Sequence, residues 1–402
     1  MKHGHLSPTI AFMTTMIPSY KLWIYTALNA IYPGQFIAVH GAERPGTVPV
    51  DVRDTRLCRD VRVKNAYLDI RGVEVTWLGH IWWFWSTRPD VIILQDGVRI
   101  ASNYVVHQLA RLVGTKVIYY GHGRNLQAAT SRLPAIARVT EWIREQYLNR
   151  CDAIVVYSDR MRTDLLARGV ATPIFVAPNT VDPDASAAYV RSISNSDVLR
   201  FRASLGVKPD QHVVCTMGRL VSERRVEGFV DVVRGIERLR PNAVHGLVIG
   251  SGPELENLVE RAEGLPVSFV GALHGRDLYE ALLAADVVYL PGRVGLPLVD
   301  SFLAGKPVVA HDIAVHSPEI DYLEDGVNGL LIPDLPTTET AARIVTLLLD
   351  STSLSAMTDG AQRWRRSLTK EAMIDGFTSA IDAAMGCVPR TSAFASEGDA
   401  TR

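Results

Sequence analysis

Short apolar runs rich in β-branched residues alternate with helix-like segments along most of the chain. The first half contains seven runs: Thr9–Met13, Gln35–His40, Val73–Leu78, Val91–Gln95, Val117–Tyr120, Ala153–Tyr157 and Ile174–Ala177. The second half contains five: Val213–Met217, Gly246–Ile249, Val267–Val270, Val287–Leu290 and Pro307–Ala310. Apolar runs separated by helices are typical of parallel strands that are covered on both faces. The two series therefore predict an α/β protein with two doubly wound, Rossmann-like domains.

A turn-rich segment, Asn179–Asp184 (NTVDPD), separates the two series and is followed by a polar stretch. We expect a first domain over residues 1–190 and a second over residues 200–370. Residues 371–387 predict a C-terminal helix that packs back toward the first domain. The small polar residues of 388–402 predict a flexible tail.

Composition and charge narrow the function classes. The chain has 402 residues, of which 47% are hydrophobic and 21% charged, as in soluble globular enzymes. The formal net charge of -1 argues against a nucleic-acid binder. Residues 1–190 nevertheless carry a net charge of +6 and the remainder -7, so an anionic partner is expected at the first half.

The cysteines are four and widely spaced, without a CxxC or Cys/His cluster, so no metal site, cofactor or disulfide framework is predicted. We see neither a signal peptide nor an apolar run long enough to span a bilayer. We expect a cytoplasmic protein, and the inner face of the membrane is the second location that the sequence leaves open.

The segment Leu290–Asp312 (LPGRVGLPLVDSFLAGKPVVAHD) is the richest in candidate chemistry. A strand is followed by a loop containing glycines and then by a helix over about 297–304. Glycines before a helix leave room for an anion at its N-terminus, which suits a diphosphate. Asp300, predicted in the first helical turn, could accept hydrogen bonds from a ribose. An ordinary strand, loop and helix without a ligand has about equal weight on this segment alone.

Two further segments follow strands of the second half. Thr216–Glu227 (TMGRLVSERRVE) places Arg219 and Arg224 in a loop, where two guanidiniums could clamp a diphosphate. The alternative is a solvated run of charges. Val248–Leu255 (VIGSGPEL) is a weak nucleotide-loop pattern, and taken alone a plain turn is favoured.

Together these segments resemble glycosyltransferase family 4, whose members have the GT-B fold of two Rossmann-like domains facing a cleft. GRLVSERR is similar to the family's diphosphate motif, with Arg219 and Arg224 at its basic positions and Gly218 beside them. The stretch FVGALHGRDLYEALLAADVVYL resembles the segment around the nucleotide base, which puts Leu273 near the base. By the same resemblance, Gly295, Leu296, Pro297 and Asp300 bind the donor. NTVD resembles the family's interdomain linker.

One departure from the family concerns the loop PGRVGL. Many members carry two acidic residues eight positions apart, and here the second is Asp300 while the first is Gly292. The chain therefore resembles a subset that has lost the first carboxylate and its contact with the donor sugar.

The resemblance assigns acceptor binding to the first half. PSYKLWIYTAL is similar to the first strand–loop–helix of related enzymes and places Tyr20 and Lys21 at the acceptor. YYGHGRN resembles the family's HG segment, with His122 near the reaction centre and Arg124 and Asn125 as acceptor contacts. A purely structural loop histidine is the alternative for His122.

Three other patterns need a structural interpretation. Asp182-Pro183-Asp184 spells a metal-binding DxD motif, but its position in the linker favours a turn, and no metal is predicted. Ile81–Trp85 (IWWFW) and the predicted helix over Ser131–Arg150 combine aromatic and basic residues. A buried stripe explains both, and a membrane-facing surface is the other interpretation.

The resemblance implies a retaining, metal-independent hexosyltransferase of the kind found in polysaccharide biosynthesis. The donor would be a nucleotide-diphosphate sugar, a UDP-sugar first and a GDP-sugar as alternative. The acceptor would be a glycan, a lipid-linked molecule or a small molecule. His122, Arg219 and Arg224 would be catalytic. A non-catalytic sugar-nucleotide-binding subunit and a sugar-nucleotide epimerase are the alternatives.

Overall fold

The computed structural model describes residues 8–42, 59–70, 73–96, 100–123 and 134–387. The tail predicted for 388–402 lies outside these ranges. The chain divides into two compact units, and each is considered by itself. Unit 1 comprises residues 1–179 and 370–402, and unit 2 comprises residues 180–369.

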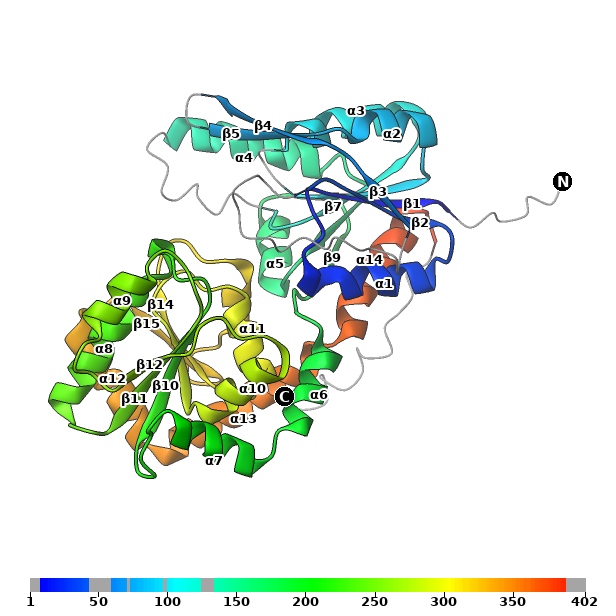
Figure 1. Cartoon of the computed structure of the whole chain (residues 1–402). Coiled ribbons are helices and arrows are strands. Elements are labelled where there is room, and N and C mark those ends of the chain that lie inside the picture. The colour runs from blue at the N-terminus through cyan, green and yellow to red at the C-terminus, as the bar shows by residue number, and fades with distance from the viewer. Residues whose placement is uncertain (1–7, 43–58, 71–72, 97–99, 124–133, 388–402) are drawn as a thin grey trace, which may run out of the picture. The chain divides into compact units, whose positions relative to one another are not determined.

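The described part of unit 1 is built on a seven-stranded parallel sheet (Figure 1). Its strand order is β3-β2-β1-β6-β7-β8-β9. The strands are β1 (Ile10–Thr14), β2 (Phe36–His40), β3 (Arg59–Arg62), β6 (Val91–Gln95), β7 (Lys116–Tyr120), β8 (Ala153–Val156) and β9 (Ile174–Val176). The polar edge strand β3 has no apolar run, and the sequence pattern therefore missed it.

Val73–Leu78 was predicted among the parallel strands, and this prediction is wrong. The segment forms β5 (Val73–Leu78), which pairs antiparallel with β4 (Asn65–Ile70) in a separate two-stranded sheet. Leu78 is buried while its neighbour Trp77 is exposed, so β5 has one covered face. One-sided burial is ordinary for antiparallel pairs and unsuited to the interior of a doubly wound sheet.

Helices cover both faces of the large sheet in unit 1. They are α1 (Leu22–Ile31), α2 (His80–Thr87), α3 (Ala101–Val113), α4 (Pro134–Leu148), α5 (Asp159–Ala167) and α14 (Lys370–Ala384). Side chains of a strand alternate between faces. In β7, the ring of Tyr119 meets Tyr147 of α4, whereas the ring of Tyr120 meets Phe377 of α14. Helices α3 and α4 therefore cover one face of the sheet, and α1 and α14 cover the other.

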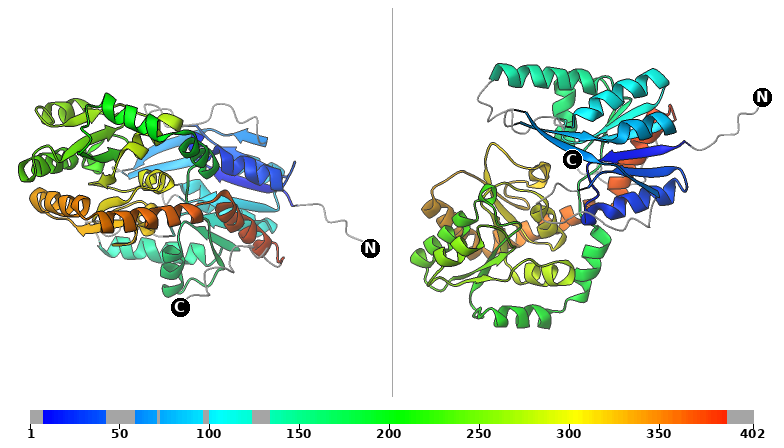
Figure 2. Two further views of the ribbon diagram at one scale, coloured as in Figure 1. Left: turned by 90° about the horizontal axis from the view of Figure 1, so that it is seen from below. Right: turned by 45° about the horizontal axis from the view of Figure 1, so that its top comes forward.

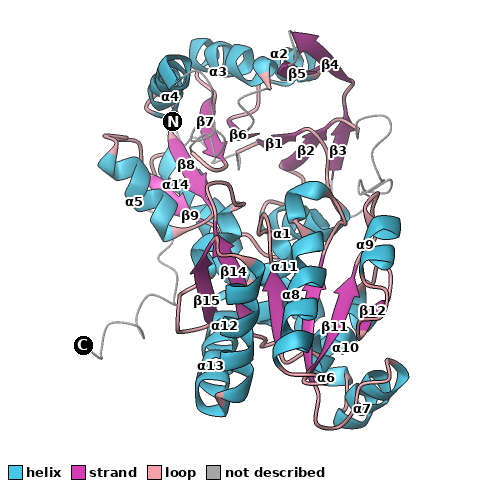
Figure 3. Ribbon diagram, turned by 90° about the vertical axis from the view of Figure 1, so that its left-hand side faces the viewer, coloured by secondary structure: helices cyan, strands magenta, loops and turns pink. Residues whose placement is uncertain are grey.

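Unit 2 is built on a six-stranded parallel sheet of order β12-β11-β10-β13-β14-β15 (Figure 3). The strands are β10 (His212–Met217), β11 (Val244–Ile249), β12 (Val267–Phe269), β13 (Val287–Leu290), β14 (Val308–Asp312) and β15 (Gly329–Pro333). The two parallel-sheet α/β units confirm the predicted fold class.

The helices of unit 2 lie in two layers, one on each face of its sheet, as the ribbons in Figure 2 show from two further directions. On each face they pack on an apolar cluster. One layer contains α8 (Val226–Leu239), α9 (Leu255–Arg261) and α12 (Thr337–Leu349). The other contains α6 (Pro183–Ser192), α7 (Asn195–Ser204), α10 (Gly275–Ala284), α11 (Leu296–Leu303) and α13 (Ser351–Ser367).

The DxD pattern is a helix start. Asp182 is the N-cap of α6, and its carboxylate accepts hydrogen bonds from the backbone N–H groups of Asp184 and Ala185, both at 3.1 Å. Pro183 occupies the first helical position, where a backbone N–H would have no partner within the helix, so the N–H that proline lacks costs no hydrogen bond. The preference for a structural turn at this motif is therefore confirmed.

Candidate functional site

The predicted donor residues of unit 2 gather around one edge of its sheet. Strand β10 lies between β11 and β13. Strands β11 and β12 are added on one side of β10, and β13 to β15 are added on the other side, so the strand order switches between β10 and β13. In open α/β sheets, ligands bind beyond the carboxyl ends of the strands at such a switch point. The loops that leave β10 (residues 218–225) and β13 (residues 291–295) both begin there.

Glycines allow the neighbouring loops to pack backbone against backbone. Gly218 has a φ of 126° and Gly250 a φ of 149°, in the region that other residues avoid. A Cβ on Gly250 would lie 1.9 Å from the carbonyl oxygen of Gly218. The Gly218 N–H in turn donates to the Ile249 carbonyl at 2.9 Å. The β10 loop is thus held against the loop after β11.

Gly292 stands at the position of the missing carboxylate, and backbone atoms of the β10 loop fill the space that a side chain would need there. A Cβ on Gly292 would lie 2.4 Å from the carbonyl carbon of Arg224 and 2.6 Å from the carbonyl oxygen of Glu223. The next residue, Arg293, donates its backbone N–H to that Glu223 oxygen at 3.0 Å. The β10 and β13 loops are therefore joined where related sequences place a side chain.

Arg224 lies inside this junction. Its guanidinium donates a hydrogen bond to the Arg293 carbonyl oxygen, and Nη2 lies 3.3 Å from a Cβ built on Gly295. Burial, followed by the nearby charge of Arg293, lowers the pKa of the Arg224 guanidinium, while Glu319 opposes this change. An arginine stays charged at neutral pH even so, and a partly desolvated cation attracts anions more strongly than an exposed one.

The other predicted donor residues border the same loops. Arg219 is exposed, and its guanidinium makes no hydrogen bond or ion pair with the described residues. Gly295 is the N-cap of α11, Leu296 and Pro297 open the helix, and the Pro297 ring lies 3.5 Å from a Cβ built on Gly218. Leu273 is half-buried between β12 and α10 and packs on the apolar core.

His316 holds the β13 loop in place, and no sequence pattern pointed to this residue. Its Nδ1 accepts from the Val294 N–H at 3.1 Å, and its Nε2 donates to the His311 carbonyl oxygen at 2.9 Å. Burial lowers the pKa of His316. The neutral ring satisfies both bonds, and the loop has a defined path into α11.

Asp300 is the fifth residue of α11 and lies just past the first turn in which it was predicted, because the helix begins one residue earlier than expected, at Leu296. Its carboxylate accepts a hydrogen bond from the Tyr279 hydroxyl at 2.9 Å. That hydroxyl also contacts the Ser186 hydroxyl at 2.6 Å. Burial raises the pKa of Asp300 to about 6, and the Tyr279 bond works in the opposite direction.

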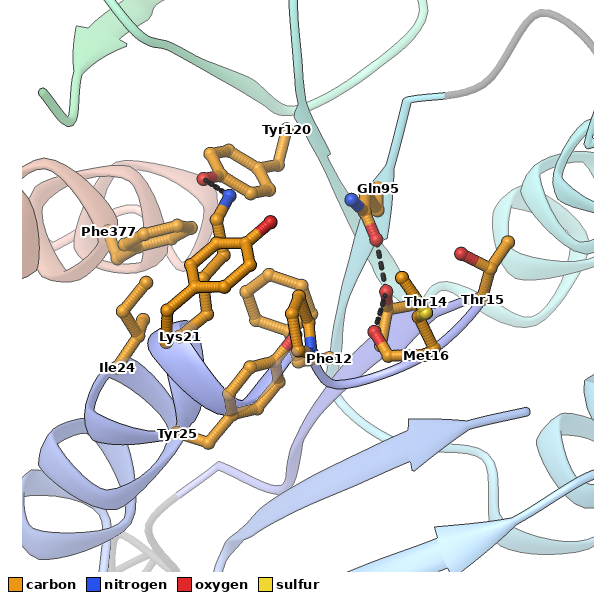
Figure 4. A pocket seen from close by; sticks show the side chains of 12 residues that line it. Phe12, Thr14, Thr15, Met16, Lys21, Ile24, Tyr25, Gln95, Tyr120 and Phe377 are labelled. Atoms are coloured by element: carbon orange, nitrogen blue, oxygen red, sulfur yellow. Dashed lines mark hydrogen bonds between the residues drawn. The ribbon is translucent and has the colours of Figure 1, made fainter. Parts of the chain in front are cut away.

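A pocket of about 120 Å³ lies at the carboxyl ends of β1, β6 and β7 in unit 1 (Figure 4). This is the switch point of the unit 1 sheet, because β1 lies between β2 and β6. Tyr20 and Lys21, in the 3-10 helix η1 (Ser19–Lys21), line the pocket together with aromatic rings. The Lys21 ammonium lies 5.7 Å from the ring centroids of both Tyr120 and Tyr157.

His122 follows β7 by two residues, and its ring packs 5.1 Å from that of Tyr157. The flanking glycines leave room for the protein's own side chains. A Cβ on Gly121 would lie 2.0 Å from the Cβ of Asp96, and one on Gly123 would lie 2.7 Å from Leu165. Two other predicted acceptor residues, Arg124 and Asn125, lie outside the described residues.

A buried network that the sequence did not reveal supports the His122 loop. The Tyr119 hydroxyl accepts the Gly123 N–H at 2.9 Å and lies near the carboxylate of Asp96. Arg144, whose side chain is 5% exposed, pairs with the same carboxylate at 3.3 Å. Burial, followed by the charge of Asp96, raises the pKa of Tyr119 well above its usual value, so the hydroxyl stays protonated.

Known families match both units. Residues 211–350 match the model for glycosyl transferases group 1, and residues 39–185 match the model for glycosyltransferase family 4. The fold is that of the GT-B glycosyltransferases. HepE of Anabaena, solved with UDP, has a TM-score of 0.65 and 18% identity over 91% of this chain and 97% of its own. Sucrose-phosphate synthase of Thermosynechococcus elongatus has a TM-score of 0.64 and 17% identity over 92% and 96%.

Curated relatives include glycosyltransferases from plants and bacteria. A sulfoquinovosyl transferase of Arabidopsis thaliana is 27% identical over 57% of this chain and 45% of its own length. An alpha-D-kanosaminyltransferase of Streptomyces kanamyceticus is 25% identical over 66% of this chain and 69% of its own. The chain thus spans under half of the plant relative. These matches support a glycosyltransferase of the family 4 group, in agreement with the resemblance inferred from the sequence.

Two features of the described residues bear on partners. Among them, no group of three histidine, cysteine or acidic side chains is placed to hold a metal ion. None of the described helices is both long enough and apolar enough to cross a membrane.

Proposed function

We propose that this protein is a retaining hexosyltransferase that moves a sugar from a nucleotide-diphosphate sugar to a glycan, lipid-linked or small-molecule acceptor. The observation that carries the proposal is the joined pair of loops at the switch point of unit 2. There the half-buried Arg224 guanidinium lies against the first residues of α11. A cation beside a helix N-terminus is a site for phosphate oxygens.

Each donor residue has a role in this proposal. Arg219 and Arg224 stabilise the charge that develops on the leaving diphosphate, and the Gly295–Pro297 backbone contacts its oxygens. Asp300 accepts hydrogen bonds from the ribose, and Leu273 packs near the base. Gly218 keeps the β10 loop close to Pro297. No metal is required, because the arginines supply the positive charge.

Unit 1 supplies the acceptor side in this proposal. Tyr20 and Lys21 hold the acceptor in the pocket beyond β1, β6 and β7, and His122 acts near the reacting groups. The leaving diphosphate accepts the proton of the acceptor hydroxyl.

A UDP-sugar is the first donor to test, because HepE was solved with UDP-glucose. GDP-mannose is the second, because a Mycobacterium tuberculosis relative with 25% identity is named GDP-mannose-dependent. Titration calorimetry with UDP, GDP, UDP-glucose and GDP-mannose should detect binding of one of the two nucleotides and of its sugar derivative. The absence of binding by all four compounds would contradict the proposal.

Replacing Arg224 tests its role directly. Losing one preorganised donor to a developing oxyanion lowers turnover on the order of a hundredfold. Arg224→Ala should show that loss at saturating donor, and Arg224→Lys should recover part of it. Arg238→Ala, on the exposed side of α8, is the matched control. Equal turnover in Arg224→Ala and the control would exclude Arg224 from the reaction.

Gly292 supports a second candidate, a non-catalytic subunit that binds a sugar nucleotide. The loop junction leaves no room for the carboxylate that related enzymes direct at the donor sugar. The two candidates differ in one measurement, which is the release of free nucleotide with and without acceptors. Nucleotide binding without any release under either condition would favour the subunit.

A further inference from the structure

The outer surface of three neighbouring helices in unit 1 has an unusual composition. Helix α2 packs against α3, and the Tyr104 ring of α3 meets the Tyr147 ring of α4 at 5.0 Å. Figures 1 and 3 both show the three helices in a row. Twelve of their described side chains are exposed: Trp82, Trp85, Ser86, Thr87, Val105, Gln108, Arg111, Leu112, Arg138, Val139, Trp142 and Ile143. We call this surface the α2–α4 face.

Large apolar side chains dominate the α2–α4 face. Trp82 is 81% exposed, Leu112 80% and Trp142 60%. The core does not need these residues, because each helix also buries an apolar stripe of its own, such as Phe84 in α2 and Val106 in α3. Large apolar side chains exposed on neighbouring helices in this way mark a place where the protein meets something else.

The charges on the α2–α4 face have one sign. Arg111 and Arg138 are exposed, and Arg88 directly after α2 lies 5.0 Å from the Trp85 ring centroid. None of the twelve exposed side chains is acidic. Glu141 of α4 is turned inward, where it pairs with Arg144 and Arg168. Helix α5, by contrast, exposes both Asp159 and Arg162.

We propose that the α2–α4 face binds the surface of a bilayer that contains anionic lipids. Tryptophan rings favour the boundary between headgroups and acyl chains, where the apolar ring is buried and the indole N–H stays hydrated. Arginines beside them meet lipid phosphates, each contributing about a fivefold gain in affinity. A protein partner would have to match arginines and tryptophans with acids and pockets, whereas an anionic bilayer offers both without shape complementarity.

Vesicle flotation of the full chain tests this assignment. The protein should float with phosphatidylcholine–phosphatidylglycerol vesicles, much less with phosphatidylcholine alone, and added salt should weaken binding because it screens the arginines. Trp82→Ser with Leu112→Ser should lower the affinity at least tenfold. Arg111→Gln with Arg138→Gln should lower it on the anionic vesicles alone. Leu199→Ser, on the exposed side of α7 in unit 2, should leave it unchanged.

Three outcomes would overturn the proposal. Equal binding to both vesicle types would remove the role of the arginines. Unchanged binding by the Trp82→Ser, Leu112→Ser variant would remove the face itself. Self-association of the wild-type chain that this variant abolishes, measured by sedimentation equilibrium without lipid, would make the face a contact between copies instead.

Discussion

Asp300 shows how strongly local surroundings set the chemistry of one side chain. Its carboxyl lies beside the Tyr279 hydroxyl on the apolar side of α11, and burial raises its pKa to about 6. The folded protein therefore binds the proton more tightly than the unfolded chain does. Stability attributable to Asp300 is present below pH 4 and is lost as the pH rises toward 6.

Asp300→Asn tests this linkage. At pH 7.5 the variant should be more stable than the wild type, and its free energy of unfolding should be larger by about 1–2 kcal/mol once the partial exposure of Asp300 is allowed for. Its unfolding temperature should be correspondingly higher. At pH 4 the difference should vanish. If Asp300 holds the ribose, the variant should also bind the nucleotide about tenfold more weakly at pH 7.5. A variant that is destabilised at pH 7.5 would show that the ionised carboxylate stabilises the fold.

At the scale of an element, the β13 loop depends on the absence of a side chain. Gly292→Ala would place a methyl group 2.4 Å from the Arg224 carbonyl carbon, and backbone cannot rotate away as a side chain does. We expect the two loops to separate, with nucleotide affinity reduced at least tenfold. Gly228→Ala in α8 is the control, because its methyl group would meet Pro291 at an ordinary 3.6 Å. Equal nucleotide affinities in the two variants would show that nucleotide binding does not depend on the contact between the β10 and β13 loops.

The loop that carries His122 depends on the Tyr119 hydroxyl. Tyr119→Phe removes the acceptor for the Gly123 N–H and leaves that N–H buried, which costs about 1–3 kcal/mol locally. Turnover should fall while nucleotide affinity, which the proposed function assigns to unit 2, stays unchanged. His122→Ala should show the same separation. Tyr104→Phe is the control on the neighbouring helix, and a loss of nucleotide affinity in Tyr119→Phe would contradict a role confined to unit 1.

At the scale of the molecule, the last described helix belongs to the first unit. The backbone of α14 lies directly on β9, because a Cβ on Gly376 would be 2.4 Å from the Val176 carbonyl oxygen. Phe377 is fully buried against Phe12 and Tyr120. The chain thus completes unit 1 only after unit 2 has been made.

Phe377→Ala should therefore destabilise unit 1 alone, by about 3–5 kcal/mol. In scanning calorimetry, UDP should raise the unfolding temperature of one transition, which we assign to unit 2. The variant should lower the other transition and leave the UDP-dependent one in place. A single transition lowered as a whole would show that the two units unfold together.

The sequence by itself determined the two doubly wound sheets, because apolar runs between helices are a local signal that burial on both faces imposes. It also located the loops at the β10 and β13 strand ends, since glycine and arginine patterns there are contiguous in the chain. It misassigned β5 and missed β3, β4 and β15, whose neighbours in the sheets are set by pairing rather than by composition.

Only the tertiary structure decided which residues meet. Gly292 looked like a lost carboxylate, and the fold shows that the backbone of Glu223 and Arg224 fills its place. Arg144 looked like part of a basic helix surface, and it is buried on Asp96, 48 residues earlier. The aromatic run at Ile81–Trp85 divides between core and exterior. These outcomes depend on contacts between distant segments, which packing selects and a local pattern does not contain.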